Sequence, residues 1–541
     1  MNILEFLKKN GTQRALLFLL ILFIFQMIFI SPFGEFALND DWVHTWSAKH
    51  LADTGELAMM PWAGATFYTP ILYGAGLIKI FGFSFSLLRI STLSLSFLFL
   101  LLLFFVLKKY TQRNSLALIG TLTLWLNPIF FNLSYTFMTD IPALLLIFVS
   151  FLLFSKAMEK GEGKSWIWFF FGTLISIIGF YTRQTNILLI IPFGLYALFR
   201  SKEHGGLMPV LTSFGIPILA GAGAYYFLFV NKLLPVAAST HFFSFNLDYL
   251  KHIILWVWQY TLIAGISLFP VSIGLVKWKT SIKNPKFILL LLGTGVLSLY
   301  LNYIFSDRLW HIGNVVHALG IGPSLVINGF QTELIDPIFQ KLLTLFGALS
   351  LSTLSWLLFQ RQSAPDEFKG GKLNLALWFC FLYSVTVVSV RGFDRYMLPV
   401  ILILILFVLR KFKEIHFSIL PTAIVLLLFL AISWSQTHHY LVWNKTRWEL
   451  ASKALEIGVA AETIEAGYEW DGWNNYWFSL EAEGKEGSST SPWWIRQLFP
   501  DNTEEYIVSF STLPGYEIME ERKMQVLNPN NKLFLLHRTE E

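Results

Sequence analysis

The apolar residues of this chain stand in long unbroken blocks, and this feature limits the fold more than any other. Several blocks reach the roughly 20 residues that a helix needs to cross a bilayer. Within hydrocarbon each backbone polar group must find a partner inside its own segment, so such blocks must be helical. Only 14% of the 541 residues are charged, against about a quarter in soluble proteins. The sequence therefore predicts an α-helical polytopic membrane protein.

The blocks predict about thirteen transmembrane helices. The block at 15–31 follows basic residues, as a signal peptide does, but it is long and Ser31-Pro32-Phe33 is a poor cleavage site, so we expect a retained helix. The thirteen segments are 15–31, 85–107, 115–131, 140–157, 166–182, 185–199, 208–230, 251–276, 287–306, 337–360, 373–390, 396–410 and 417–435.

Basic residues between the blocks predict the orientation. Alternate loops are rich in Lys and Arg, near 108–113, 156–164, 200–202, 277–286, 361–372 and 410–413. The positive-inside rule puts these loops and the N-terminus in the cytoplasm, and the C-terminus outside. The single cysteine, Cys380, and the short inner loops favour a bacterial inner membrane.

Composition divides the chain into two predicted domains. Residues 1–436 form a transmembrane domain, whose first outer loop, 32–84, has helical amphipathic stretches around 43–53 and 67–80. After 436 the long apolar runs vanish, which predicts a small extracytoplasmic α/β domain over 437–541. Its predicted elements are a helix at 448–457 and strands at 506–510, 524–527 and 533–537.

Several classes of function are disfavoured. A lone cysteine excludes a disulfide within the chain and a cysteine metal cluster. Nucleotide-binding fingerprints and a basic nucleic-acid domain are absent from the sequence. His311 and His317 are six residues apart, a poor spacing for one helix face, so a structural role is the better interpretation than metal binding.

Three aspartates are predicted at the same outer face. Asp40 and Asp41 follow the first span, and Asp140 opens the fourth. Each can simply cap the helix that it precedes or begins. Their convergence at one membrane face favours chemistry instead, because a carboxylate there can accept a proton, orient another residue or hold a cation.

Arginines at the predicted outer face are contrary to the positive-inside rule and call for an explanation. Arg183 lies in a tight turn between two spans, and Arg391 and Arg395 flank Gly392-Phe393-Asp394 before a late span. The planar guanidinium suits phosphate, to which it donates two parallel hydrogen bonds. The alternatives are contact with lipid headgroups or pairing with Asp394.

In the order and spacing of these motifs the chain resembles the GT-C membrane glycosyltransferases, in the branch of the protein O-mannosyltransferases and aminoarabinose transferases. The resemblance covers about residues 15–435 and a thirteen-span plan with an outer tail. Its motifs are the acidic pair in Asp40–His44, the Thr54-Gly55 turn, the Pro-aromatic helix at Tyr68–Tyr73, Asp140, and the Arg-aromatic-Leu-Pro run at Arg395–Pro399. Three positions depart from the family pattern: Asp41 stands where Glu is common, His44 where an aromatic residue is frequent, and Tyr68-Thr69 where many relatives have Glu-Lys or Lys before the proline.

The resemblance implies inverting transfer of a sugar from a polyprenyl phosphate to a lipid, glycan or protein hydroxyl. By position Asp40 is then the general base, and Asp41 and Asp140 are further catalytic residues that orient the acceptor, the base or a bound cation. Arg391, Arg395, Arg183, His44 and Tyr68 are the implied substrate contacts. A divalent cation is the one candidate cofactor. The alternative function is a lipid or sugar transporter or flippase, which predicts broken helices and pseudo-symmetric halves.

Overall fold

The thirteen predicted spans all coincide with helical segments in the computed structural model. The described residues are 11–60, 67–159, 164–234, 247–305, 313–322, 327–360, 371–390, 392–481, 502–527 and 531–539. The segments are α2 (Gly11–Phe29), α5 (Phe85–Thr111), α6 (Asn114–Trp125) with α7 (Pro128–Ser134), α8 (Asp140–Ala157), α9 (Ser165–Phe180), η1 (Gln184–Leu189) with α10 (Ile190–Phe199), α11 (Leu207–Val230), α12 (Leu247–Leu275), α14 (Pro285–Phe305), α15 (Pro337–Gln360), α16 (Lys372–Ser389), α17 (Leu398–Lys411) and α18 (Ile419–Glu456). Short turns η2 (Ser201–His204) and α13 (Trp278–Ser281) lie between them.

Nine helices in the described ranges are long and apolar enough to cross a membrane, and ten if α6 and α7 form one bent span. That pair bends by 69° because Pro128 begins α7 and the Asn127 side chain caps it, accepting from the Ile129 and Phe130 amides. The helical polytopic fold is thus confirmed. Thirteen crossings stay a prediction, because α9, η1 with α10, and α17 are shorter helices.

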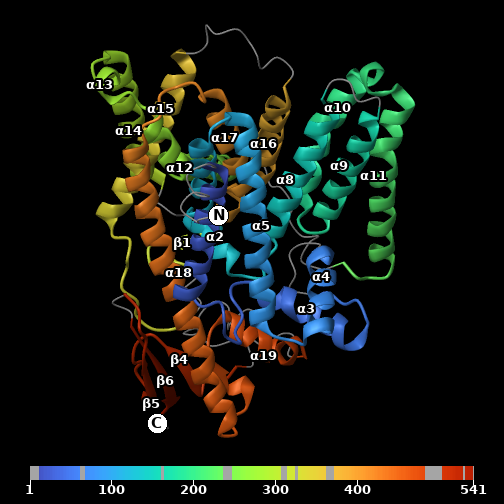
Figure 1. Ribbon diagram of the computed structural model, residues 1–541. Coiled ribbons are helices and arrows are strands. Elements are labelled where there is room, and N and C mark those ends of the chain that lie inside the picture. Colours follow the sequence, from blue (N-terminus) through green and yellow to red (C-terminus); the bar gives the residue numbers. More distant parts are fainter. Residues whose placement is uncertain are drawn as a thin grey trace, which may run out of the picture.

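The first loop forms the two predicted helices, α3 (Asp41–Thr54) and α4 (Tyr68–Phe81). Both lie at one end of the bundle, the end that also carries the C-terminal sheet (Figure 1). Arg89, near the start of α5, is buried and donates to the carbonyls of Pro32 (2.6 Å) and Phe36 (2.7 Å). This charge within a predicted span therefore holds the chain that leads into α3.

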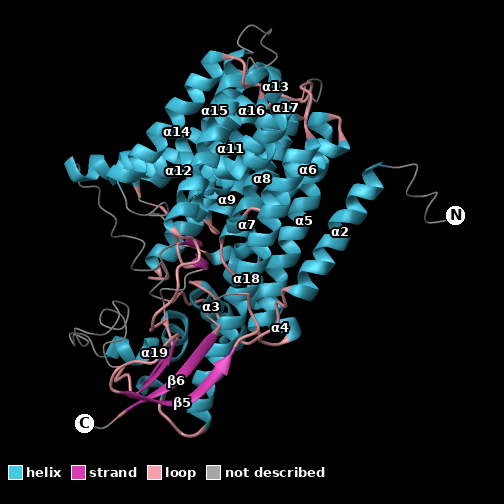
Figure 2. Ribbon diagram, turned by 90° about the vertical axis from the view of Figure 1, so that its left-hand side faces the viewer, coloured by secondary structure: helices cyan, strands magenta, loops and turns pink. Residues whose placement is uncertain are grey.

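The C-terminal region folds as a four-stranded sheet with one helix, in the strand order β3-β4-β6-β5. β3 and β4 are parallel and the other pairs antiparallel. The elements are η6 (Ala461–Thr463), β3 (Ile464–Glu465), α19 (Tyr468–Glu481), β4 (Tyr506–Ser509), β5 (Tyr516–Lys523) and β6 (Lys532–Arg538). The helix predicted at 448–457 is the last part of α18, which runs without a break from the bundle to the sheet (Figure 2).

Two of the three predicted strands, at 506–510 and 533–537, are confirmed by β4 and β6. The strand predicted at 524–527 is wrong, since the strand there is β5 and ends at Lys523. β5 is an edge strand with mostly exposed, charged residues, so it lacks the apolar alternation of a covered strand. The division into domains at 436 stays a prediction.

The loops predicted to be cytoplasmic meet at the other end of α5 and α8. Glu159 lies 3.2 Å from the Lys109 Nζ and 3.1 Å from those of Lys156 and Lys372. Arg410, at the end of α17, donates to the Tyr110 carbonyl at 3.0 Å. Basic loops far apart in sequence therefore share one face, as the charge pattern predicts.

A buried ion pair joins α18 to α19. The Arg447 Nη2 lies 2.5 Å from the Glu469 Oε2, and both side chains are fully buried. Arg447 also donates to the Asn444 side chain (2.7 Å) and the Ala466 carbonyl (3.1 Å). The other Glu469 oxygen accepts from the Asn39 amide at 2.9 Å, so this pair anchors the C-terminal region to the first loop.

Arg447→Ala should destabilise this junction strongly, because it leaves the Glu469 carboxylate buried and unpaired. Breaking such a pair costs about 3–5 kcal/mol. Thermal unfolding of the purified protein measures the effect. Arg522→Ala is the matched control: it removes partly exposed pairs with Glu449 and Glu520, which are worth at most about 1 kcal/mol. Equal losses of Tm would contradict the assigned importance of the buried pair.

Candidate active site

The adjacent carboxylates at the start of α3 point to different surroundings. Asp41 is 3% exposed, and its two oxygens accept from the backbone amides of Leu38 (2.6 Å) and Phe137 (3.2 Å). Burial raises the pKa of Asp41 to about 7, although these amides act to lower it. The Asp40 side chain does not cap α3 and is 35% exposed. The Asp41 carboxylate thus binds backbone amides, while the Asp40 carboxylate remains accessible.

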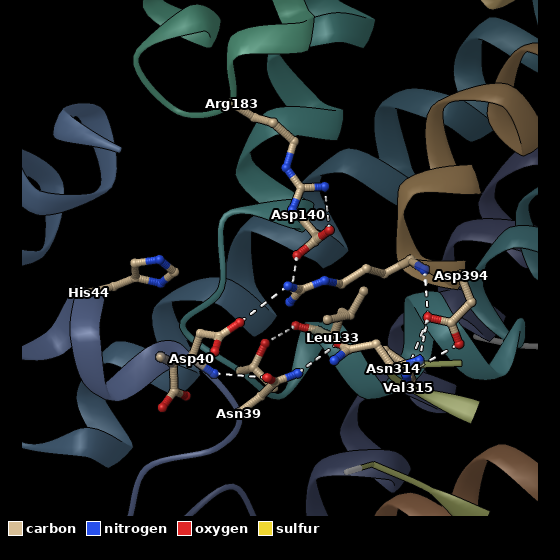
Figure 3. A network of polar contacts seen from close by, with 12 residues as sticks. Asn39, Asp40, His44, Leu133, Asp140, Arg183, Asn314, Val315 and Asp394 are labelled. Carbon is tan, nitrogen blue, oxygen red and sulfur yellow. Dashed lines mark hydrogen bonds and ion pairs between the residues drawn. The ribbon is translucent and has the colours of Figure 1, made fainter. Parts of the chain in front are cut away.

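Asp40 lies in a network of four charged residues. Its Oδ2 is 3.2 Å from the Arg395 Nη2, and its Oδ1 accepts from the Tyr468 hydroxyl at 3.1 Å. The Asp140 Oδ1 is 2.7 Å from the Arg183 Nη1, and its Oδ2 is 3.8 Å from the Arg395 Nη1. Figure 3 shows Asp140 lying between Arg183 and the Asp40 side of the network. Two arginines therefore balance two aspartates.

The network is held by charge more than by aligned hydrogen bonds. Asp140, 4% exposed, makes close ion pairs, but neither of its oxygens has an aligned hydrogen bond among the described residues. The Arg183 guanidinium stacks on the Tyr396 ring, 4.4 Å from its centroid. Stacking leaves its edge free to pair with a carboxylate or a phosphate. Asp140 is thus placed to hold both arginines.

Asp394 fixes the turn that carries Arg395. Its buried carboxylate accepts from the amides of Asn314 (3.1 Å), Val315 (3.2 Å), Val316 (2.9 Å) and Arg395 itself (2.7 Å). These contacts, seen in Figure 3, join the η5 turn (Asp394–Met397) to the small hairpin of β1 (Val316–His317) and β2 (Gly320–Ile321). The pairing of Arg395 with Asp394, an alternative from the sequence, is therefore wrong: the Asp394 carboxylate binds backbone amides.

The side chains of His44 and Tyr68 both donate hydrogen bonds to backbone carbonyls. The His44 Nδ1–H donates to the Phe137 carbonyl at 3.2 Å, and its ring meets the Phe67 ring edge-on. Burial lowers the pKa of His44 to about 4, so the ring is neutral at pH 7. The Tyr68 hydroxyl donates to the Leu233 carbonyl. Their part in substrate binding stays a prediction.

The remaining sequence candidates give no metal centre. Arg391 and His311 lie outside the described residues. The His317 Nε2 contacts the Asn314 carbonyl at 2.9 Å. Within the described ranges, no group of three His, Cys, Asp or Glu residues could hold a metal ion. Between Asp40 and Asp140, where a bridging cation would bind, lies the Arg395 guanidinium.

An apolar cavity of about 250 Å³ lies on the other side of the hairpin residue Val316 from Asp394. Val316 joins the two, because it lines the cavity while its amide binds Asp394. Polar groups are few and gather on Asn127, Ser267, Ser435 and Gln436. The apolar walls come from α7, α12, α15, α18 and the hairpin, and include Ile129, Ile263, Ile321, Leu343 and Phe429.

Sequence reasoning missed Tyr468, Asn39 and Glu469. Tyr468 contacts Asp40 across 428 positions of the chain, so no local pattern signals the contact. The Asn39 side chain donates to that of Asn314 at 3.0 Å, and its φ of 56° makes the turn before Asp40. The one signal available was the prediction that the tail and the first loop share the outer face.

Residues 72–220 match the family described as dolichyl-phosphate-mannose-protein mannosyltransferase, which confirms the resemblance over that part of the chain. The matched part includes Asp140 and Arg183. ArnT from Cupriavidus metallidurans is similar at 10% identity, over 97% of this chain and 98% of that chain. Its structure bound to undecaprenyl phosphate gives a TM-score of 0.41, and its apo structure 0.42. No curated protein sequence matches the chain.

The buried neutral His44 should make stability depend on pH. Its folded pKa of about 4 lies below the usual 6.5, so the unfolded chain takes up the proton first as pH falls. Between about pH 6.5 and 4 this protonation by itself should lower the free energy of unfolding by about 3 kcal/mol, whereas Asp41, whose folded pKa is raised, contributes with the opposite sign in both wild type and variant. In His44→Gln, which can still donate to the Phe137 carbonyl, this drop should be absent.

Thermal unfolding from pH 7 to pH 4 measures the difference between wild type and variant. His416→Gln, at an exposed position, is the control and should keep the wild-type profile. Parallel profiles for wild type and His44→Gln would contradict the neutral, buried state of this histidine.

Proposed function

We propose, from the family match over residues 72–220, that this chain is a membrane glycosyltransferase. It moves a sugar from a polyprenyl-phosphate donor to a hydroxyl of a lipid, glycan or protein on the outer face. The observation that carries the proposal is the accessible Asp40 carboxylate, held beside the Asp140, Arg183 and Arg395 network. The donor, the acceptor and the surrounding membrane lipids are the partners, and nucleic acid is not one.

The reaction is a single displacement. The acceptor oxygen attacks the anomeric carbon, the bond from that carbon to the phosphate oxygen breaks, and the phosphate leaves with the electron pair, inverting the carbon. Asp40 takes the acceptor proton. Its contacts with Arg395 and Tyr468 leave lone pairs for this, since a carboxylate has about four acceptor positions. A positioned base accelerates such a step by roughly 10²–10⁴-fold.

The arginines serve the leaving group. Phosphate carries the negative charge that develops as the bond breaks, so it needs cations more than a proton donor. Arg395 and Arg183 are the described candidates, and Asp140 keeps their guanidinium groups together in the absence of substrate. Arg391 is a further candidate by sequence. Asp41, predicted as catalytic, binds two backbone amides, so we assign it to holding the loop that positions Asp40.

The cavity supports a lipid-linked donor. Its walls are apolar and its hairpin side touches the residues that fix Arg395. An isoprenoid segment of the donor would suit these apolar walls. Transport of a lipid or sugar remains the alternative outcome of the experiment below.

Asp40→Asn should abolish sugar transfer while preserving the fold, because the amide keeps the shape but cannot take the proton. Membranes with matched expression are incubated with a panel of radiolabelled polyprenyl-phosphate sugars, and label is counted in lipid, glycan and protein fractions. The expected loss is roughly 10²–10⁴-fold. The control is Asp53→Asn, on the exposed end of the same helix.

The possible results separate the candidate functions. Transfer by wild type and by the Asp53 variant alone supports the enzyme and identifies donor and acceptor classes together. Equal transfer by Asp40→Asn would remove Asp40 as the base. Failure of wild type with every donor would favour the transporter.

The proposed orientation makes a separate prediction. With buried Cys380 replaced by Ala, single cysteines at exposed Glu56 and Thr512 should react with a membrane-impermeant maleimide in intact cells. Cysteines at exposed Lys202 and Lys279 should react only after the membrane is opened. Labelling of all four positions in intact cells, or the reverse pattern, would contradict the orientation.

A further inference from the structure

The C-terminal region reaches into the candidate site through Tyr468, the first residue of α19. Its hydroxyl donates to the Asp40 Oδ1 at 3.1 Å. Its ring is 8% exposed and packs edge-on against Trp42, with centroids 5.8 Å apart. A side chain from the tail therefore contacts the carboxylate that we assign as the base.

The neighbouring residues of α19 hold the same turn. Glu469 accepts from the Asn39 amide at 2.9 Å and is itself fixed by Arg447. Gly472 lies so close to Trp42 that a Cβ there would be 2.6 Å from the indole ring. Contacts on both sides of Asp40 thus come from one short helix, which leaves the Asp40 backbone little freedom.

We propose that Tyr468 is a positioning residue for the reaction, which makes the C-terminal region part of the active site. This inference rests on the proposed glycosyltransferase function. Tyr468 holds one oxygen of Asp40 while Arg395 holds the other, so the plane of the carboxylate is set by two donors on opposite sides. The oxygens are thereby aimed at the acceptor, and misalignment of a base lowers the rate steeply.

The other charged and titratable groups around Asp40 are Arg395 on η5, His44 on α3 and Tyr440 on α18. Tyr468→Phe leaves all of these side chains unchanged. A change in kcat then reports the lost hydrogen bond.

The test is the steady-state kinetics of Tyr468→Phe, which keeps the ring against Trp42 and removes only the hydroxyl. We expect kcat to fall about 10-fold, with KM changed less than about twofold, because the base is misaligned while substrate binding is kept. Tyr506→Phe, in β4 and away from the site, is the control and should match wild type. A wild-type kcat for Tyr468→Phe, or a loss that lies in KM alone, would overturn the inference.

A second substitution keeps the inference testable if Tyr468→Phe fails to fold. Site-specific 3-fluorotyrosine at position 468 keeps the shape and the hydroxyl donor, so kcat should stay within about twofold of wild type. A fall of kcat to about the level expected of Tyr468→Phe would overturn the inference.

A double-mutant cycle separates this inference from the proposed function. Tyr468→Phe should lower Tm in the wild-type background and lower it less when Asp40 is Ala, because the shared hydrogen bond is then already lost. Additive changes would overturn the contact itself, whether or not the enzyme is active. Failure of wild type to transfer any sugar, with coupling still present, would overturn the reaction and not the contact.

Discussion

The candidate site depends on the Arg395 guanidinium, which lies between two carboxylates from different segments. Its side chain is 6% exposed, and its Nη2 and Nη1 face Asp40 and Asp140 respectively. A buried charge is costly unless it is paired. Among the residues that the structure describes, removing Arg395 would leave Asp140 with Arg183 alone and the Asp40 carboxylate with only the Tyr468 hydroxyl. This one cation therefore joins the first loop, α8 and η5 at one end of the bundle.

The surrounding structure serves to hold that cation and its partners in place. Asp394 gathers four backbone amides and so fixes the turn that carries Arg395. Asp41 does the same for the segments around Leu38 and Phe137. The adjacent residues Asp40 and Asp41 thus have different roles: the Asp41 carboxylate binds backbone amides, and the Asp40 carboxylate is accessible. The difference follows from burial, because the oxygens of a buried carboxylate need hydrogen-bond donors.

Much of the site was predictable because its members break local rules. Asp40, Asp140, Arg183 and Arg395 are charges at helix ends on a face where few charges occur, and the structure brings all four together. Other contacts had no local signal. Tyr468 is one of many aromatic residues in the tail, and nothing in its neighbourhood distinguishes it until α19 packs against Trp42. His44 and Tyr68 lie within family motifs but depart from the commoner residues there, and both donate to backbone carbonyls.

The sequence by itself determined the helical membrane fold, the placement of the helical segments and the set of charged residues that meet in the candidate site. It could do so because both signals are local. The length of an apolar segment predicts a helix, since unpaired backbone polar groups are costly in hydrocarbon. The positive charge of a loop predicts its side, since basic residues are costly to translocate. Only the tertiary structure decided which carboxylate oxygen pairs with which arginine, and that the C-terminal region contributes to the candidate site. Those choices depend on contacts across hundreds of residues, whose energies exist only once the helices are packed.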